Sequence, residues 1–134
     1  MLRKLNNKAG FTLVEIMIVV AIIALLAAIA VPSFLRARKR SQATRILEDL
    51  RIIDSAIDQY AIENNKAGGD PVIWNDIQAY LKKGSVIYNA GGKDMLGGTF
   101  SSGNYSVDSI PKIATTTFQK LSDVAPSDFW SPFY

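Results

Sequence analysis

The chain has 134 residues, enough for one domain, and contains neither cysteine nor histidine. Disulfide bridges, thiolate zinc sites and imidazole acid–base catalysis are therefore excluded. Its 15 basic and 12 acidic residues give a net charge of +3, but three basic residues precede a long apolar stretch, and without them 12 basic residues balance 12 acidic ones. A nucleic-acid-binding surface needs a dense basic face, so we expect no general nucleic-acid partner.

The N-terminal segment combines a basic start with a long apolar run. The first ten residues, MLRKLNNKAG, carry Arg3, Lys4 and Lys8, and FTLVE follows them. Residues 16–35 then contain no charge. As a helix, this run would extend roughly 30 Å, about the thickness of the hydrocarbon layer of a bilayer. We therefore expect a membrane-spanning helix.

The junction between these two parts has a specific pattern. A basic leader ends in Gly10, and Phe11, Thr12, two aliphatic residues, Glu15 and the apolar run follow. This arrangement closely resembles the prepilin class that type IV pilins share with type II secretion pseudopilins. Six consecutive positions, 10–15, fit the pattern, which makes it more specific than an isolated short motif. The resemblance implies a structural fibre subunit and no enzymatic activity.

The resemblance also implies how the N-terminus is processed. A prepilin peptidase would cleave after Gly10, remove residues 1–10, and leave a new amino group on Phe11 that is then N-methylated. Glu15 would attract this amine on a neighbouring subunit, because an unpaired carboxylate near the bilayer centre costs about 2.5–3.5 kcal/mol. A second interpretation, compatible with the first, is that Glu15 caps the first helical turn, where a negative charge favours the helix dipole.

Partners and location follow from the same resemblance. The implied partners are other copies of the chain, minor pilins or pseudopilins, the peptidase and methylase, and an inner-membrane assembly platform with its ATPase. The implied location is a single-pass protein of the bacterial inner membrane, with a periplasmic or other extracytoplasmic C-terminal head. From there the subunit would enter a pilus or a pseudopilus.

Pro32 interrupts the backbone hydrogen bonds of the apolar segment. It has no N–H to donate to the carbonyl of Ala28, so we expect a kink or a loosened turn. The resemblance implies that this proline lets the helix stretch during packing into a fibre. The alternative is that the helix ends here, at the edge of the membrane.

The same N-terminal residues fit a rival interpretation. A conventional secretory signal also has basic residues, an apolar core and an A-x-A cleavage site, which Ala28, Ile29 and Ala30 supply. Cleavage before Val31 would release an exported soluble binding protein or enzyme.

Beyond the membrane half, 11–35, the pattern predicts an amphipathic continuation of the helix over residues 36–64. Its apolar positions recur at helical spacing: Ile46, Leu50, Ile53, Ile57 and Tyr60. We interpret the acidic residues between them as a solvated face rather than a catalytic pair: Glu48, Asp49, Asp54 and Asp58. The basic cluster 36–40 is expected to contact lipid phosphates first and acidic neighbours after assembly.

Residues 65–134 are expected to form a small α+β head. The stretch KAGGDP, residues 66–71, predicts a turn, and residues 74–81 predict a short helix closed by Gly84. Short strands are predicted at 86–88, 99–100 and 105–107, which would give a small antiparallel sheet packed against the long helix.

Two further features of the head bear on function. Residues 94–100, DMLGGTF, loosely resemble an Asp-x-x-Gly-x-x-aromatic element of major type II pseudopilins, although Met95, Leu96 and Gly98 depart from it. Those proteins often hold calcium in a C-terminal loop.

Oxygen ligands for such an ion could come from Asp108, Asp123 and Asp128, but their spacing lacks the alternation of an EF-hand loop. The simpler interpretation is that they are turn and cap residues. The aromatic C-terminus, 129–134, is expected to dock in the core or, alternatively, to contact another subunit.

Overall fold

The computed structural model describes residues 9–134. Arg3, Lys4 and Lys8 of the predicted leader lie outside the described residues. The chain divides into two compact units, Met1–Arg36 and Ala37–Tyr134. One helix, α1 (Leu13–Glu63), belongs partly to each unit.

Burial along α1 changes sharply with position. The apolar side chains of residues 13–35 are exposed, and the first buried side chain of the helix is that of Ala43. From there one face is buried, comprising Ala43, Ile46, Leu47, Leu50, Ile53, Ala56 and Ile57. The second half of the helix therefore has one buried face, and Tyr60 packs against the edge of the same core.

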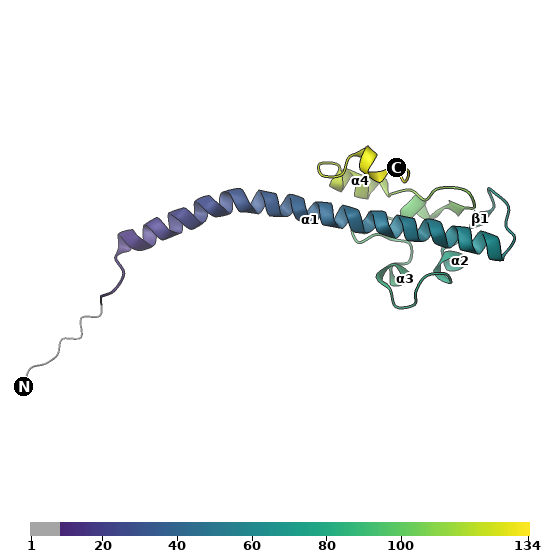
Figure 1. The fold of residues 1–134 in the computed structure, drawn as a ribbon, viewed down its shortest axis with the longest axis horizontal. Coiled ribbons are helices and arrows are strands. Elements are labelled where there is room, and N and C mark those ends of the chain that lie inside the picture. Colours follow the sequence, from purple (N-terminus) through teal and green to yellow (C-terminus); the bar gives the residue numbers. More distant parts are fainter. Residues whose placement is uncertain (1–8) are drawn as a thin grey trace, which may run out of the picture. The chain divides into compact units, whose positions relative to one another are not determined.

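The head elements are short and lie along the second half of α1 (Figure 1). In the described part of the chain they are β1 (Pro71–Val72), α2 (Trp74–Gln78), α3 (Val86–Ala90), the 3₁₀ turn η1 (Phe100–Gly103), β2 (Tyr105–Ser106), α4 (Thr115–Leu121) and α5 (Ser127–Trp130). Together with α1 they form an α+β fold in which helix predominates over sheet.

The sheet consists of β1 and β2, which pair antiparallel with Pro71 opposite Ser106 and Val72 opposite Tyr105. Backbone bonds beyond the strands extend this pairing, because Gly69 N–H donates to the carbonyl of Val107 at 2.9 Å. The predicted strand at 105–107 is confirmed at Tyr105–Ser106. Its partner was not predicted, because 66–71 was interpreted only as a turn.

Two predicted strands were wrong, and local capping explains one of them. Residues 86–88 lie in helix α3, because the hydroxyl of Ser85 accepts a hydrogen bond from the N–H of Tyr88 and Gly91 ends the helix in a left-handed conformation. These two caps outweigh the β-propensity of the apolar residues between them.

The strand predicted at 99–100 is reduced to a single bridge between Thr99 and Lys93. The chain turns directly after it, since Ser101 and Ser102 have φ values of 49° and 52° and cannot continue a strand. Helix α2 is confirmed but ends at Gln78, and Gly84, with φ of 82°, lies in the later turn that leads into α3.

The aromatic C-terminus docks in the core, as predicted. Trp130 is fully buried and its indole N–H donates to the carbonyl of Ala125 at 2.9 Å. Phe133 is also buried, and its carbonyl accepts from the N–H of Ile113 at 2.8 Å. These contacts attach the end of the chain to the rest of the head without a disulfide.

Candidate functional site

The predicted cleavage junction lies ahead of α1. Gly10 and Phe11 are exposed and non-helical, and the Phe11 side chain is 86 % accessible. A Cβ on Gly10 would meet no atom within 4 Å, so no steric contact in the structure requires a glycine at this position. An accessible bond outside any helix or strand can be reached by a protease.

Glu15 takes part in a reciprocal cap at the start of α1. Its carboxylate accepts from the N–H of Thr12 at 2.9 Å, and its own N–H donates to the Thr12 hydroxyl at 3.2 Å. This is a capping box, which satisfies two backbone donors that the helix itself cannot use. The capping interpretation of Glu15 therefore has a geometric basis, and it leaves one carboxylate oxygen outside these two bonds.

The segment after Glu15 presents an apolar surface on all sides. Every large apolar side chain of residues 16–35 is exposed, from 48 % at Ile16 to 71 % at Ile29. Among the described residues, α1 is the one helix long and apolar enough to span a membrane. Such a surface is stable only against lipid or other protein.

Pro32 lies inside α1 and does not end it. The alternative of a helix end at this position is therefore wrong. The missing N–H leaves the Ala28 carbonyl without its usual partner. Cleavage before Val31, as a conventional signal would need, would cut within this helix.

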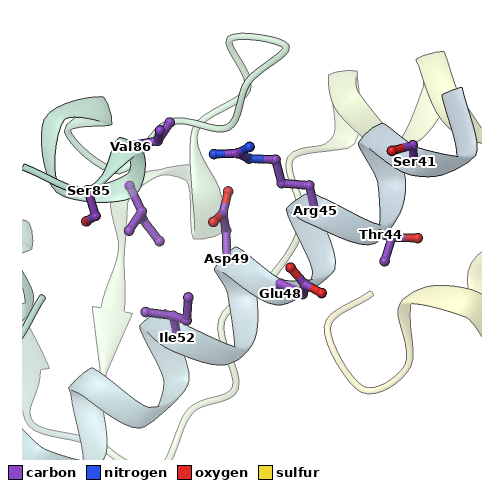
Figure 2. Close-up of a pocket in the computed structure, with 9 residues that line it drawn as sticks. Ser41, Thr44, Arg45, Glu48, Asp49, Ile52, Ser85 and Val86 are labelled. Atoms are coloured by element: carbon purple, nitrogen blue, oxygen red, sulfur yellow. The ribbon is translucent and has the colours of Figure 1, made fainter. Parts of the chain in front are cut away.

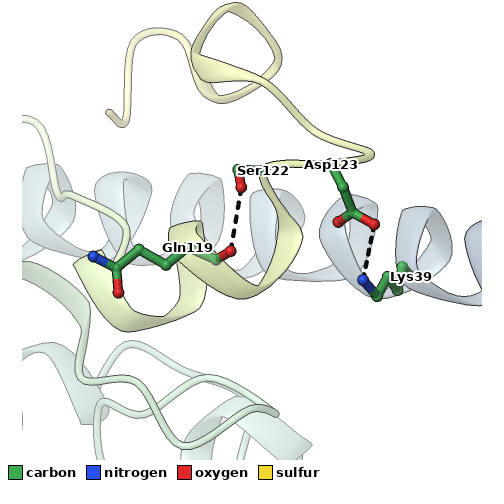
Figure 3. Close-up of polar contacts among 4 residues, drawn as sticks. All are labelled: Lys39, Gln119, Ser122 and Asp123. Atoms are coloured by element: carbon green, nitrogen blue, oxygen red, sulfur yellow. Dashed lines mark hydrogen bonds and ion pairs between the residues drawn. The ribbon is translucent and has the colours of Figure 1, made fainter.

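Two residues of the basic cluster 36–40 bind other parts of the same chain. Lys39 Nζ lies 2.8 Å from a carboxylate oxygen of Asp123 (Figure 3). Arg40 donates to the carbonyl of Val124 at 3.0 Å, and its guanidinium carbon lies 5.4 Å from the centre of the Phe129 ring. These contacts attach the α4–α5 region to α1.

The acidic face of α1 is solvated, but not uniformly. The pKa of Asp49 is raised, mainly by burial. The charge of nearby Arg45 lowers this pKa, and the charge of Glu48 raises it. The pKa of Asp54 is raised by burial and then by the charge of Asp58.

The calcium candidates are in different settings. Asp108 lies in a turn with φ of 60°, Asp123 pairs with Lys39, and Asp128 lies in the first turn of α5. Within residues 9–134 no three acidic side chains come close enough to form a metal site. Calcium binding stays a prediction that these positions do not support as a group.

A buried carboxylate organises the 94–100 element. Asp94 accepts from the N–H groups of Leu96 at 2.8 Å and Gly98 at 2.9 Å, and from the hydroxyl of Thr117. Phe100, at the end of the element, is fully buried. The sequence resemblance identified this segment, but nothing in the spacing indicated that Thr117 would be the third donor.

Comparison with known proteins bears directly on the N-terminal segment. The family model described as the prokaryotic N-terminal methylation motif matches residues 5–31. The type II secretion system core protein G of Klebsiella michiganensis is 31 % identical over 81 residues, 60 % of this chain and 55 % of that protein. In this N-terminal segment the chain is similar to type IV pilin-like proteins.

Other proteins similar to this chain include pilus subunits. The type IV wide pilus major component PilA4 of Thermus thermophilus is 44 % identical over 61 residues, 46 % of this chain and 47 % of that protein. The type IV major fimbrial protein FimA of Dichelobacter nodosus is 34 % identical over 97 residues, 72 % of this chain and 52 % of that protein.

The chain spans about half the length of each of these relatives. No solved structure gives a significant match. The named relatives are fibre and secretion-system proteins, which does not favour the exported soluble protein.

Proposed function

We propose that this pilin-like protein is a structural subunit of a pilus or a type II secretion pseudopilus. The observation that carries the proposal is the exposed apolar half of α1 directly behind an accessible Gly10–Phe11 junction. Before assembly this half lies in the membrane, and in the fibre it packs against the same half of other copies. Contacts of this kind are head-to-tail and do not close, so they produce a filament.

Processing is the first step of the proposed pathway. A prepilin peptidase cleaves after Gly10, and the new amine of Phe11 is methylated. Intact-mass and peptide mass spectrometry of the protein from membrane and sheared fractions tests this step. Methylated Phe11 at the N-terminus supports the proposal, whereas a mature start at Val31 overturns it.

A variant pair sharpens the same test. Gly10→Val is expected to leave the full-length precursor in the membrane, because the peptidase reads the residue before the cut. Ala9→Val, one position earlier, is the matched control and is expected to be processed normally. Normal processing of Gly10→Val would contradict the proposed cleavage.

Glu15 is proposed to pair with the Phe11 amine of a neighbouring copy, in addition to capping its own helix. Two substitutions separate these roles. Glu15→Gln keeps a capping oxygen but removes the charge, and it should be processed yet incorporated poorly into fibres. Thr12→Ala weakens the cap but keeps the charge, and it should be incorporated well. Normal fibres from Glu15→Gln would exclude the charge pairing.

A separate experiment identifies the type of fibre. Removing the protein from its host should abolish protein secretion if the fibre is a pseudopilus, and adhesion or surface motility if it is an extended pilus. The 94–100 element favours the pseudopilus, because the buried Asp94 and Phe100 occupy the two ends of the element that resembles those proteins.

A further inference from the structure

A surface pocket of about 610 Å³ lies between α1 and the start of α3, entirely within the second unit. Its wall includes Arg45, Glu48, Asp49 and Ile52 from α1 and Ser85 and Val86 from the α3 side. Figure 2 shows Asp49 and Arg45 projecting from α1 into the space that Val86 borders. None of the core contacts described above uses these side chains.

Asp49 is the half-buried charge of this pocket. Its carboxylate accepts no hydrogen bond from the residues that the structure describes. Burial raises the pKa of Asp49, the nearby Arg45 lowers it, and the charges of Glu48 and Asp94 raise it further. The pocket wall carries two carboxylates, Glu48 and Asp49, against one cation, Arg45, so a further cation would be favourable.

The pocket also has an apolar part. Ile52 is 45 % exposed and Val86 is 60 % exposed, and Figure 2 shows them on either side of Asp49. A small inorganic cation would leave both side chains in water. A long basic side chain fits both parts, because its aliphatic stem covers apolar surface while its charged end reaches the carboxylate.

The chain itself carries suitable side chains in the basic cluster 36–40. Lys39 and Arg40 already bind Asp123 and Val124. Arg36 and Arg38 are exposed and have no partner among the described residues, and of these two only Arg38 belongs to the same unit as the pocket. It lies on the same helix as Asp49, about 16 Å before it at 1.5 Å per residue, too far for a pair within one chain.

We propose that the Asp49 pocket of one subunit receives Arg38 of a second copy of this chain. The contact rests on the proposed fibre function, in which parallel α1 helices lie side by side. It sets the displacement between the two helices at about 16 Å along their axis. It also gives the head-proximal half of α1 a role in subunit register that the apolar half does not supply.

Cross-linking tests the contact directly, because the chain contains no cysteine. Arg38→Cys and Asp49→Cys are co-produced in the native host, and a short bismaleimide is added to intact fibres, since an arginine spans more than a disulfide does. A cross-linked dimer is expected with both variants present and not with either alone. Arg51→Cys replaces Asp49→Cys in the control pair, and it should give no dimer with Arg38→Cys.

Charge exchange provides the second measurement. Arg38→Asp and Asp49→Arg are each expected to lower the amount of subunit in sheared fibres about tenfold, and the double variant is expected to restore it. Arg51→Asp makes the same change of charge outside the pocket and should leave incorporation unchanged. Because the double variant reverses the defect, loss of folding cannot imitate this result.

The outcomes separate the two proposals. Wild-type protein that is absent from sheared fibres would overturn the proposed function and the contact with it. Wild-type fibres without the Arg38–Asp49 cross-link, or single variants that assemble normally, would overturn the contact alone. A double variant as defective as the single variants would do the same.

Discussion

Asp94 is expected to be among the most important polar side chains for the stability of the head. It is 6 % exposed and is the common acceptor for two backbone N–H groups and one hydroxyl. In Asp94→Ala these three donors lose their acceptor in the interior. A buried donor without a partner costs about 1–3 kcal/mol, so we expect a loss of about 3–5 kcal/mol in the free energy of unfolding.

Asp94→Asn is the matched control. Its carbonyl oxygen can accept from Leu96 and Gly98, which both donate to the same Asp94 oxygen, Oδ1. Its amide can donate to the hydroxyl of Thr117, which only has to rotate. Since all three contacts can be kept, the expected loss falls to about 1 kcal/mol.

Urea unfolding of the full chain in detergent measures both variants. The fluorescence of the two tryptophans reports the transition, because Trp130 is fully buried in the folded head. The reasoning would be refuted if Asp94→Asn were as unstable as Asp94→Ala, or if Asp94→Ala lost less than about 1 kcal/mol.

Three further predictions use the same unfolding measurement. Tyr105→Phe should be near neutral at pH 7, because the buried hydroxyl makes no hydrogen bond to the described residues. Burial raises the pKa of Tyr105 from 10.0 to about 12. The wild type should therefore lose stability as the pH rises between these two values, and Tyr105→Phe should lose less. Equal losses of stability in the two proteins would contradict this prediction. Gly98→Ala should cost about 1–3 kcal/mol, because the new Cβ would lie 2.6 Å from that of Ala114, and a neutral result would exclude tight packing there. Lys39→Met should cost at most about 1 kcal/mol, because the side chains of Lys39 and Asp123 are 44 % and 52 % exposed, and a larger loss would assign the pair a greater role.

The helical part of the fold was predictable because its signals are long. Residues 16–35 carry no charge and residues 46–60 keep one apolar face over several turns, so many positions indicate the same helix. The candidate processing site was identified in the same way, since positions 10–15 fit one pattern together. A cap by Glu15 was one of its two compatible interpretations, but the reciprocal bonds with Thr12 were not predicted.

The head was harder to predict because its elements are short. At 86–88 the apolar residues favour a strand, but two residues outside that segment, Ser85 and Gly91, cap it as a helix. The short strand β1 was not predicted because it adjoins a turn-forming stretch. Only its pairing with β2 defines it as a strand. Thr117 joins Asp94 from 23 residues away, and no local pattern encodes that contact.

The absence of cysteine gives the head a practical property. Its polar link between distant segments, Asp94 to Thr117, and the docking of Trp130 do not depend on thiol–disulfide chemistry. The folded head should therefore be equally stable with and without a thiol reductant. Any cysteine placed on its surface would be the sole thiol of the chain, which makes single-site labelling with probes and spin labels straightforward.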